Sequence, residues 1–237
     1  MQNEGVQTLI YQEFGISESA FKTLEEYKLI VKKMKKIETL IEEILKNEAD
    51  ETCVEFYEDE LKHLETYRQI KGATDEELIE FEKEFGVLPN SFKELYRYKN
   101  GSGYPFNILF PCYDDEICTP QFLLSLDEIR KVKTYFCNKD MHLKDYVDES
   151  ELENLDKRIR PYLQHTNWLP FAEMPNGAIH LMLDFNPTEV GTVGQIIIFI
   201  HDPDFVYYVS DSLENLLEDA IAFLEDDGAY EEYQGWS

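Results

Sequence analysis

The spacing of apolar residues changes once along this chain, and that change limits the folds it can adopt. From Phe21 to Leu45, apolar residues recur at steps of three and four, which is the spacing of one helical face. From Trp168 to Val209, short β-branched and aromatic runs alternate with turn sequences, which is typical of consecutive strands. Because helices come first and strands follow together, the order predicts an α+β fold and not alternating βαβ units.

The strand-rich part predicts the centre of the fold. Its runs lie at 168–171, 179–185, 195–200 and 206–209. The run from Ile196 to Ile200 is apolar throughout, which indicates a central strand buried on both faces. Ser212 follows the last run and predicts the cap of a closing helix. We therefore expect a mixed, mainly antiparallel central sheet flanked by helices.

The middle of the chain carries clear helix signals. Thr74 and Glu77 have the spacing of a capping box, and Gly86 is placed to end that helix. Short strands are expected at 106–110 and 122–124. The polar segment 138–160 is expected to be a mobile or helical insertion on the surface.

The first 71 residues are predicted to be a helical extension. Its longest helix contains the basic run Lys32 to Lys36, which we interpret as a solvated face paired with acids of the same helix. A membrane-binding or nucleic-acid-binding helix is the alternative interpretation of that run. We divide the chain into this extension (1–71), a core domain (72–228) and an acidic tail (229–237), and expect that the extension can mediate homodimerisation.

Charge is the most informative feature of the composition. The chain has 22 basic and 49 acidic residues, a formal charge of −27, and it has no Lys or Arg after Arg160. Such a protein is repelled by nucleic acid and by anionic membranes, and it is attracted to basic proteins. We therefore expect a basic protein partner, with simple solubility as the alternative explanation of the charge.

The predicted compartment is the cytoplasm. The chain begins without a basic and apolar leader, and no apolar run reaches the ~20 residues of a membrane span. In that compartment the four cysteines are expected to be reduced and structural. Cys112 and Cys118 could meet across a turn, but we expect neither a disulfide nor a metal site there.

If the chain were an enzyme, its residues would best fit a metal-dependent hydrolase. Its candidate ligands are His180, Asp184, His201, Asp202 and Asp204. On one strand, however, residues four apart are separated by about 13 Å, which is too far for one metal ion. We therefore predict no enzyme activity, no cofactor and no metal.

Five motifs in order resemble the SUKH superfamily, which includes the Smi/Knr cell-wall regulators of fungi and many bacterial immunity proteins. The motifs are the helix at 73–89, the helix from Ser91 to Gly101, Trp168-Leu169-Pro170, the paired strands at 177–196, and the helix start at 209–213. The chain departs from the family pattern at Leu213, where Phe is usual, and in the long segment 138–160.

This resemblance implies a non-enzymatic binding domain, either an immunity protein that neutralises a toxin, often a nuclease, or an intracellular regulator of cell-wall synthesis. Nucleases are commonly basic, which agrees with the charge argument. We expect partner contacts on acidic and aromatic loop residues. These are Tyr104, Tyr113, Asp114, Asp115, Glu116, Asp202 and Asp204.

Overall fold

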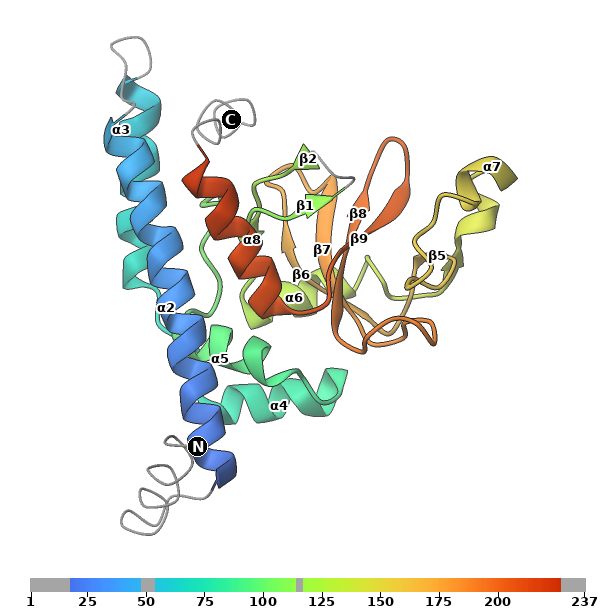
Figure 1. Cartoon of the computed structure of the whole chain (residues 1–237), viewed down its shortest axis with the longest axis horizontal. Coiled ribbons are helices and arrows are strands. Elements are labelled where there is room, and N and C mark those ends of the chain that lie inside the picture. Colours follow the sequence, from blue (N-terminus) through green and yellow to red (C-terminus); the bar gives the residue numbers. More distant parts are fainter. Residues whose placement is uncertain (1–17, 48–53, 114–116, 227–237) are drawn as a thin grey trace, which may run out of the picture.

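The computed structural model describes residues 18–47, 54–113 and 117–226. Its centre is a five-stranded sheet with the strand order β3-β6-β7-β8-β9, in which every neighbouring pair is antiparallel (Figure 1). The strands are β3 (Phe122–Leu123), β6 (Trp168–Glu173), β7 (Ile179–Asp184), β8 (Gln195–Ile200) and β9 (Phe205–Ser210). The predicted α+β fold with a mainly antiparallel sheet is confirmed.

Strand β8 shows why the apolar run predicted a central strand. It pairs with β7 on one side and with β9 on the other, and Ile196, Ile197 and Ile198 are fully buried. Side chains of a strand alternate between the two faces, so a continuous apolar run requires that both faces be covered.

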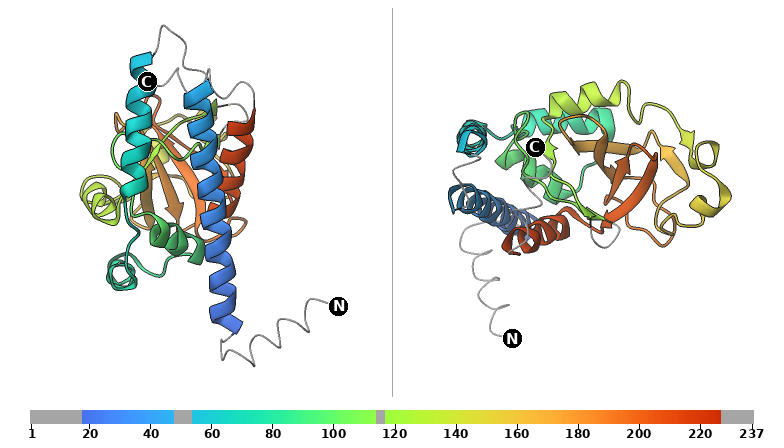
Figure 2. Two further views of the ribbon diagram at one scale, coloured as in Figure 1. Left: turned by 90° about the vertical axis from the view of Figure 1, so that its left-hand side faces the viewer. Right: turned by 90° about the horizontal axis from the view of Figure 1, so that it is seen from above.

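Helices flank the sheet. They are α2 (Glu18–Asn47), α3 (Val54–Gln69), α4 (Asp75–Phe85), α5 (Asn90–Tyr98), α6 (Leu126–Lys133) and α8 (Leu213–Glu225). Figure 2 shows α3, α2 and α8 side by side in one layer beside the sheet. The predicted caps are present: Thr74 and Glu77 form a reciprocal capping box, and Ser212 accepts from Asn215 N. No helix among the described residues is long and apolar enough to cross a membrane.

The buried face of the long helix α2 packs into the same hydrophobic core as the rest of the chain. Ile30, Met34 and Ile37 are fully buried there. The basic run on this helix pairs differently from the prediction. Lys33 lies 2.7 Å from Glu218 and Lys36 lies 2.9 Å from Glu225, and both acids are on α8. The expected pairing within one helix is thus wrong for these two lysines, because packing places α8 directly against α2.

The segment 138–160 is built from short elements. These are β4 (Met141–His142), the 3-10 turn η1 (Leu143–Asp145) and α7 (Glu149–Leu152), and β5 (Tyr162–Gln164) follows and pairs with β4. Leu143 is fully buried. The carbonyl of Arg158 accepts from Thr188 N at 3.0 Å and from Gln195 Nε2 at 3.1 Å. These contacts attach the segment to the loop between β7 and β8 and to the first residue of β8.

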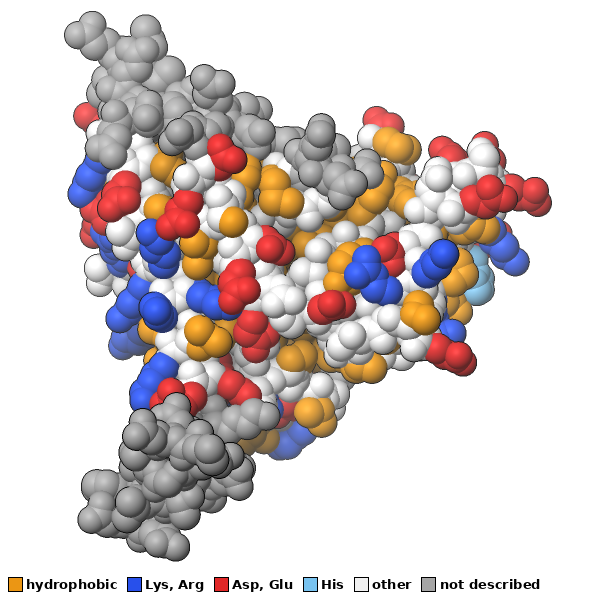
Figure 3. Space-filling model, viewed as in Figure 1, with side chains coloured by type: hydrophobic (Ala, Val, Ile, Leu, Met, Phe, Trp, Pro, Cys, Tyr) orange, Lys and Arg blue, Asp and Glu red, His pale blue; other side chains and the backbone are white. Residues whose placement is uncertain are grey.

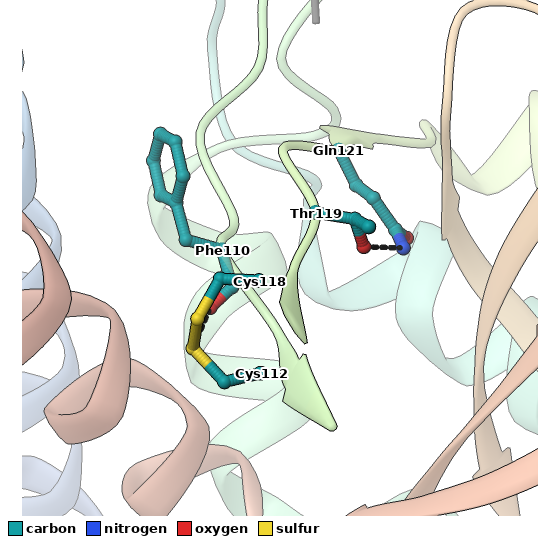
Figure 4. Close-up of a disulfide and its surroundings, with 5 residues drawn as sticks. All are labelled: Phe110, Cys112, Cys118, Thr119 and Gln121. Carbon is teal, nitrogen blue, oxygen red and sulfur yellow. Dashed lines mark hydrogen bonds between the residues drawn. A yellow bond between two sulfur atoms is a disulfide. The ribbon is translucent and has the colours of Figure 1, made fainter. Parts of the chain in front are cut away.

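The predicted strand at 106–110 is reduced to one bridge between Leu109 and Gln121. Beyond it lies a hairpin of β1 (Cys112–Tyr113) and β2 (Ile117–Cys118), whose cysteines form a disulfide (Figure 4). The expectation of reduced thiols is therefore wrong for this pair. The two residues are direct partners in the antiparallel register, which brings their Cα atoms to 4.0 Å. Cys137 is free and buried, and burial raises the pKa of its thiol to about 12.

Candidate functional site

A groove follows strand β9 on the surface of the sheet. Two hollows of about 470 and 460 Å³ lie on either side of Asn154 and Tyr207, which line both of them, and we call the pair of hollows the edge groove. Its lining residues are Cys112, Tyr113, Val147, Glu151, Asn154, Asp156, Arg158 and the run from Pro203 to Val209. Strand β9 is the last strand of the sheet, so the groove lies where the sheet meets surrounding loops.

The first wall of the groove is the disulfide-linked hairpin. The Tyr113 ring lies 5.3 Å from the Tyr207 ring, measured between centroids. The disulfide between Cys112 and Cys118 joins the two strands of this hairpin directly next to Tyr113. The hairpin therefore presents an aromatic side chain to β9 from a covalently closed loop.

The second wall comes from the segment between Val147 and Arg158. The Arg158 guanidinium lies 3.2 Å from the centroid of the Tyr208 ring, which is a cation–π contact. The same guanidinium donates to both carboxylate oxygens of Asp156, at 2.9 and 2.7 Å. This pair raises the pKa of Arg158 and lowers that of Asp156, chiefly through their hydrogen bonds. The arginine is thus neutralised locally and fixed on the tyrosine.

The electrostatic character of the groove is acidic. Glu151, Asp156 and Asp204 contribute three carboxylates to its lining, whereas Arg158 contributes the single guanidinium. Asp204 accepts a hydrogen bond from His201 at 2.6 Å, and this bond raises the pKa of the imidazole. Figure 3 shows acidic side chains gathered over α7 and apolar side chains in the hollow beside it.

The structure separates the predicted contact residues into groups. Tyr113 and Asp204 both line the edge groove, and Asp202 lies in the β8–β9 turn with a φ of 65°. Tyr104 packs edge-on against Phe122 of β3, at the opposite edge of the sheet. Asp114, Asp115 and Glu116 lie outside the described residues. The role of all seven in partner binding stays a prediction.

The second wall was not identified from the sequence. Glu151, Asn154, Asp156 and Arg158 belong to the segment that was interpreted as a surface insertion. Nothing in their local pattern relates them to β9, because Arg158 and Tyr208 are far apart in the chain and meet only through tertiary packing.

The residues of the metal-hydrolase hypothesis have other partners. The Asp184 carboxylate accepts from Trp168 Nε1 at 2.8 Å and from Gln195 Nε2 at 3.0 Å. Burial raises the pKa of Asp184, and these hydrogen bonds oppose that rise. His180 stacks on Phe136 at 4.1 Å. Over residues 18–47, 54–113 and 117–226, no group of three or more His, Cys, Asp or Glu side chains is arranged to hold a metal ion.

Comparison with known proteins adds one finding. No curated protein matches the chain. The SMI1/KNR4 family (SUKH-1) matches residues 72–219, a range that contains both walls of the edge groove and the whole central sheet and leaves out α2 and α3. Since this range is more than half of the sequence, the chain belongs to the SMI1/KNR4 family, SUKH-1.

Proposed function

We propose that this chain is a non-enzymatic binding protein that neutralises a basic toxin domain as an immunity protein, with a nuclease toxin as the leading candidate. The observation that carries the proposal is the edge groove, which combines aromatic side chains with an excess of carboxylates. Aromatic residues supply contact area in protein interfaces, and complementary charge accelerates the encounter with a basic partner.

The ion pairs of the acidic residues support a choice among the acids in this proposal. Glu218 and Glu225 pair with lysines of α2, and Asp184 is buried among its hydrogen-bond donors. Glu218 and Glu225 are thus paired with lysines and Asp184 is buried, so we give these three carboxylates less weight as partner contacts. Glu151 and Asp204 face the edge groove instead, so we assign steering of the partner to that region.

Co-expression tests the proposal directly. If the neighbouring gene encodes a large secreted protein with a basic C-terminal domain, the chain is expressed together with that domain, and cell growth and complex formation are measured; absence of such a gene favours regulation of cell-wall synthesis. We expect growth to be rescued and a complex to form at low salt. If growth is not rescued and no complex forms at low salt, immunity is rejected, and regulation of cell-wall synthesis becomes the function to test.

A charge reversal then tests the groove. Replacing Glu151 and Asp204 together with lysine is expected to slow association with the toxin domain about tenfold at low salt, with a smaller effect at high salt. Glu76→Lys is the control, because Glu76 is exposed on α4, away from the groove. Because the groove variant reverses two charges and the control reverses one, equal effects per reversed charge would show that only net charge matters.

A further inference from the structure

The two halves of the edge groove are built from the same chemical groups but are filled differently. In the half next to the hairpin, the chain places its own Arg158 between an aromatic ring and a carboxylate, those of Tyr208 and Asp156. The other half, which we call the α7 pocket, is a hollow of about 460 Å³. It is lined by Val147, Glu151, Asn154, Pro203, Asp204, Phe205 and Tyr207.

The α7 pocket contains an aromatic floor. The rings of Phe205 and Tyr207 lie 5.1 Å apart at an interplanar angle of 58°, and both residues come from β9. Residues 205 and 207 point to the same face of the strand, which explains why their rings meet. A ring face of this kind attracts a cation, most strongly a guanidinium that stacks flat on it.

Carboxylates stand at the rim of the same pocket. Glu151 is exposed on α7, where one of its oxygens accepts from Asp148 N as part of a capping box. Asp204 accepts from His201 through Oδ1. No Lys or Arg side chain of the described residues lines this pocket, so its carboxylates are not neutralised by a lining lysine or arginine. An amide group, that of Asn154, completes the polar rim.

We propose that the α7 pocket binds an arginine side chain of the protein partner. The guanidinium would stack on the Tyr207 ring beside the buried Phe205 and pair with Glu151 or Asp204, which repeats the arrangement of Arg158 on Tyr208 and Asp156. Arginine fits better than lysine because its planar head stacks on a ring and donates two parallel hydrogen bonds to a carboxylate. The apolar stem of arginine would lie against Val147 and Pro203. This inference rests on the proposed function, since it assumes a protein partner.

A titration with small probes tests the pocket without the toxin domain. The full chain is labelled with ¹⁵N, and backbone amide shifts are followed while acetyl-Gly-Arg-Gly-amide is added. The matched probes carry lysine or citrulline in place of arginine, and citrulline has nearly the same shape as arginine without the charge. We expect saturable shifts at Phe205 and Tyr207 with a millimolar Kd for the arginine probe, weaker binding of the lysine probe, and none of the citrulline probe.

Variants locate the binding. Glu151→Gln and Asp204→Asn are each expected to weaken binding of the arginine probe about two- to fivefold, since each removes one partly exposed charge pair. Glu149→Gln is the matched control, because Glu149 is exposed on the same helix and does not line the pocket. Glutamine at position 151 can still serve the capping box, so α7 is expected to stay folded.

The outcomes separate this inference from the proposed function. Equal shifts with the arginine and citrulline probes, or no shift at Phe205 and Tyr207, would overturn the arginine pocket even if the toxin complex forms. An equal loss in Glu149→Gln and Glu151→Gln would also overturn it, because the effect would then be one of general charge. Failure of the toxin complex alongside selective arginine binding would reject the toxin as the partner and leave the pocket supported.

Discussion

Glu38→Ala removes an acceptor that two tyrosine hydroxyls share. The Glu38 carboxylate on α2 accepts from Tyr67 Oη of α3 at 3.1 Å and from Tyr98 Oη of α5 at 2.8 Å. Tyr67 is fully buried, whereas Tyr98 is half-buried. The carboxylate thus joins three helices at one buried point, and two of them precede the segment that matches the family.

The expected cost follows from the different burial of the two tyrosines. The Tyr67 hydroxyl would lose its acceptor where water cannot replace it, which costs about 1–3 kcal/mol. The Tyr98 hydroxyl can turn to solvent, so losing its hydrogen bond to Glu38 costs about 1 kcal/mol, the net value of one hydrogen bond. We therefore expect Glu38→Ala to lower the free energy of unfolding by about 2–4 kcal/mol.

Urea denaturation followed by circular dichroism measures this loss. Glu43→Ala is the control, because Glu43 is an exposed residue of the same helix and the substitution should change stability by about 0.5 kcal/mol or less. Tyr67→Phe should cost clearly less in the Glu38→Ala background than in the wild-type chain, since the shared bond is already lost. A loss no larger than that of the control, or additive effects of the two substitutions, would refute the account of Glu38 as a buried link between the helices.

Three further predictions concern protonation and the cysteines. Hydrogen bonds from Arg68 and then Lys46 lower the pKa of Glu42 to about 2, so this carboxylate stabilises the fold above about pH 4.5 and loses that contribution as the pH falls towards 2. Denaturation across that pH range should show that the free energy of unfolding falls by about 1 kcal/mol, after allowance for solvent screening. The Glu42→Gln variant should lack this fall. Burial raises the pKa of the Cys137 thiol to about 12, so peptide mapping should find Cys137 unmodified by iodoacetamide at pH 8 in the native protein and modified in urea. Reduction of the bond between Cys112 and Cys118 should lower stability by about 2 kcal/mol through loss of loop closure, and the double variant Cys112→Ser, Cys118→Ser should be insensitive to the reductant.

The features that were predicted correctly depend on residues close together in the chain. The capping box joins Thr74 and Glu77, which are three positions apart, and the uninterrupted apolar run of β8 predicts its burial. Hydrogen bonds and side-chain periodicity of this kind act within one element, so the sequence alone determined the long helices, the main strands and, through their order, the α+β class.

Long-range contacts were decided only by the tertiary structure. Lys33 pairs with Glu218, 185 residues away, and not with a neighbour on its own helix. The edge groove likewise needs Arg158 to reach Tyr208 and the hairpin to bring Tyr113 to Tyr207. The physical reason is that local patterns specify which face of an element is apolar, whereas the partner of each face depends on how the whole core packs.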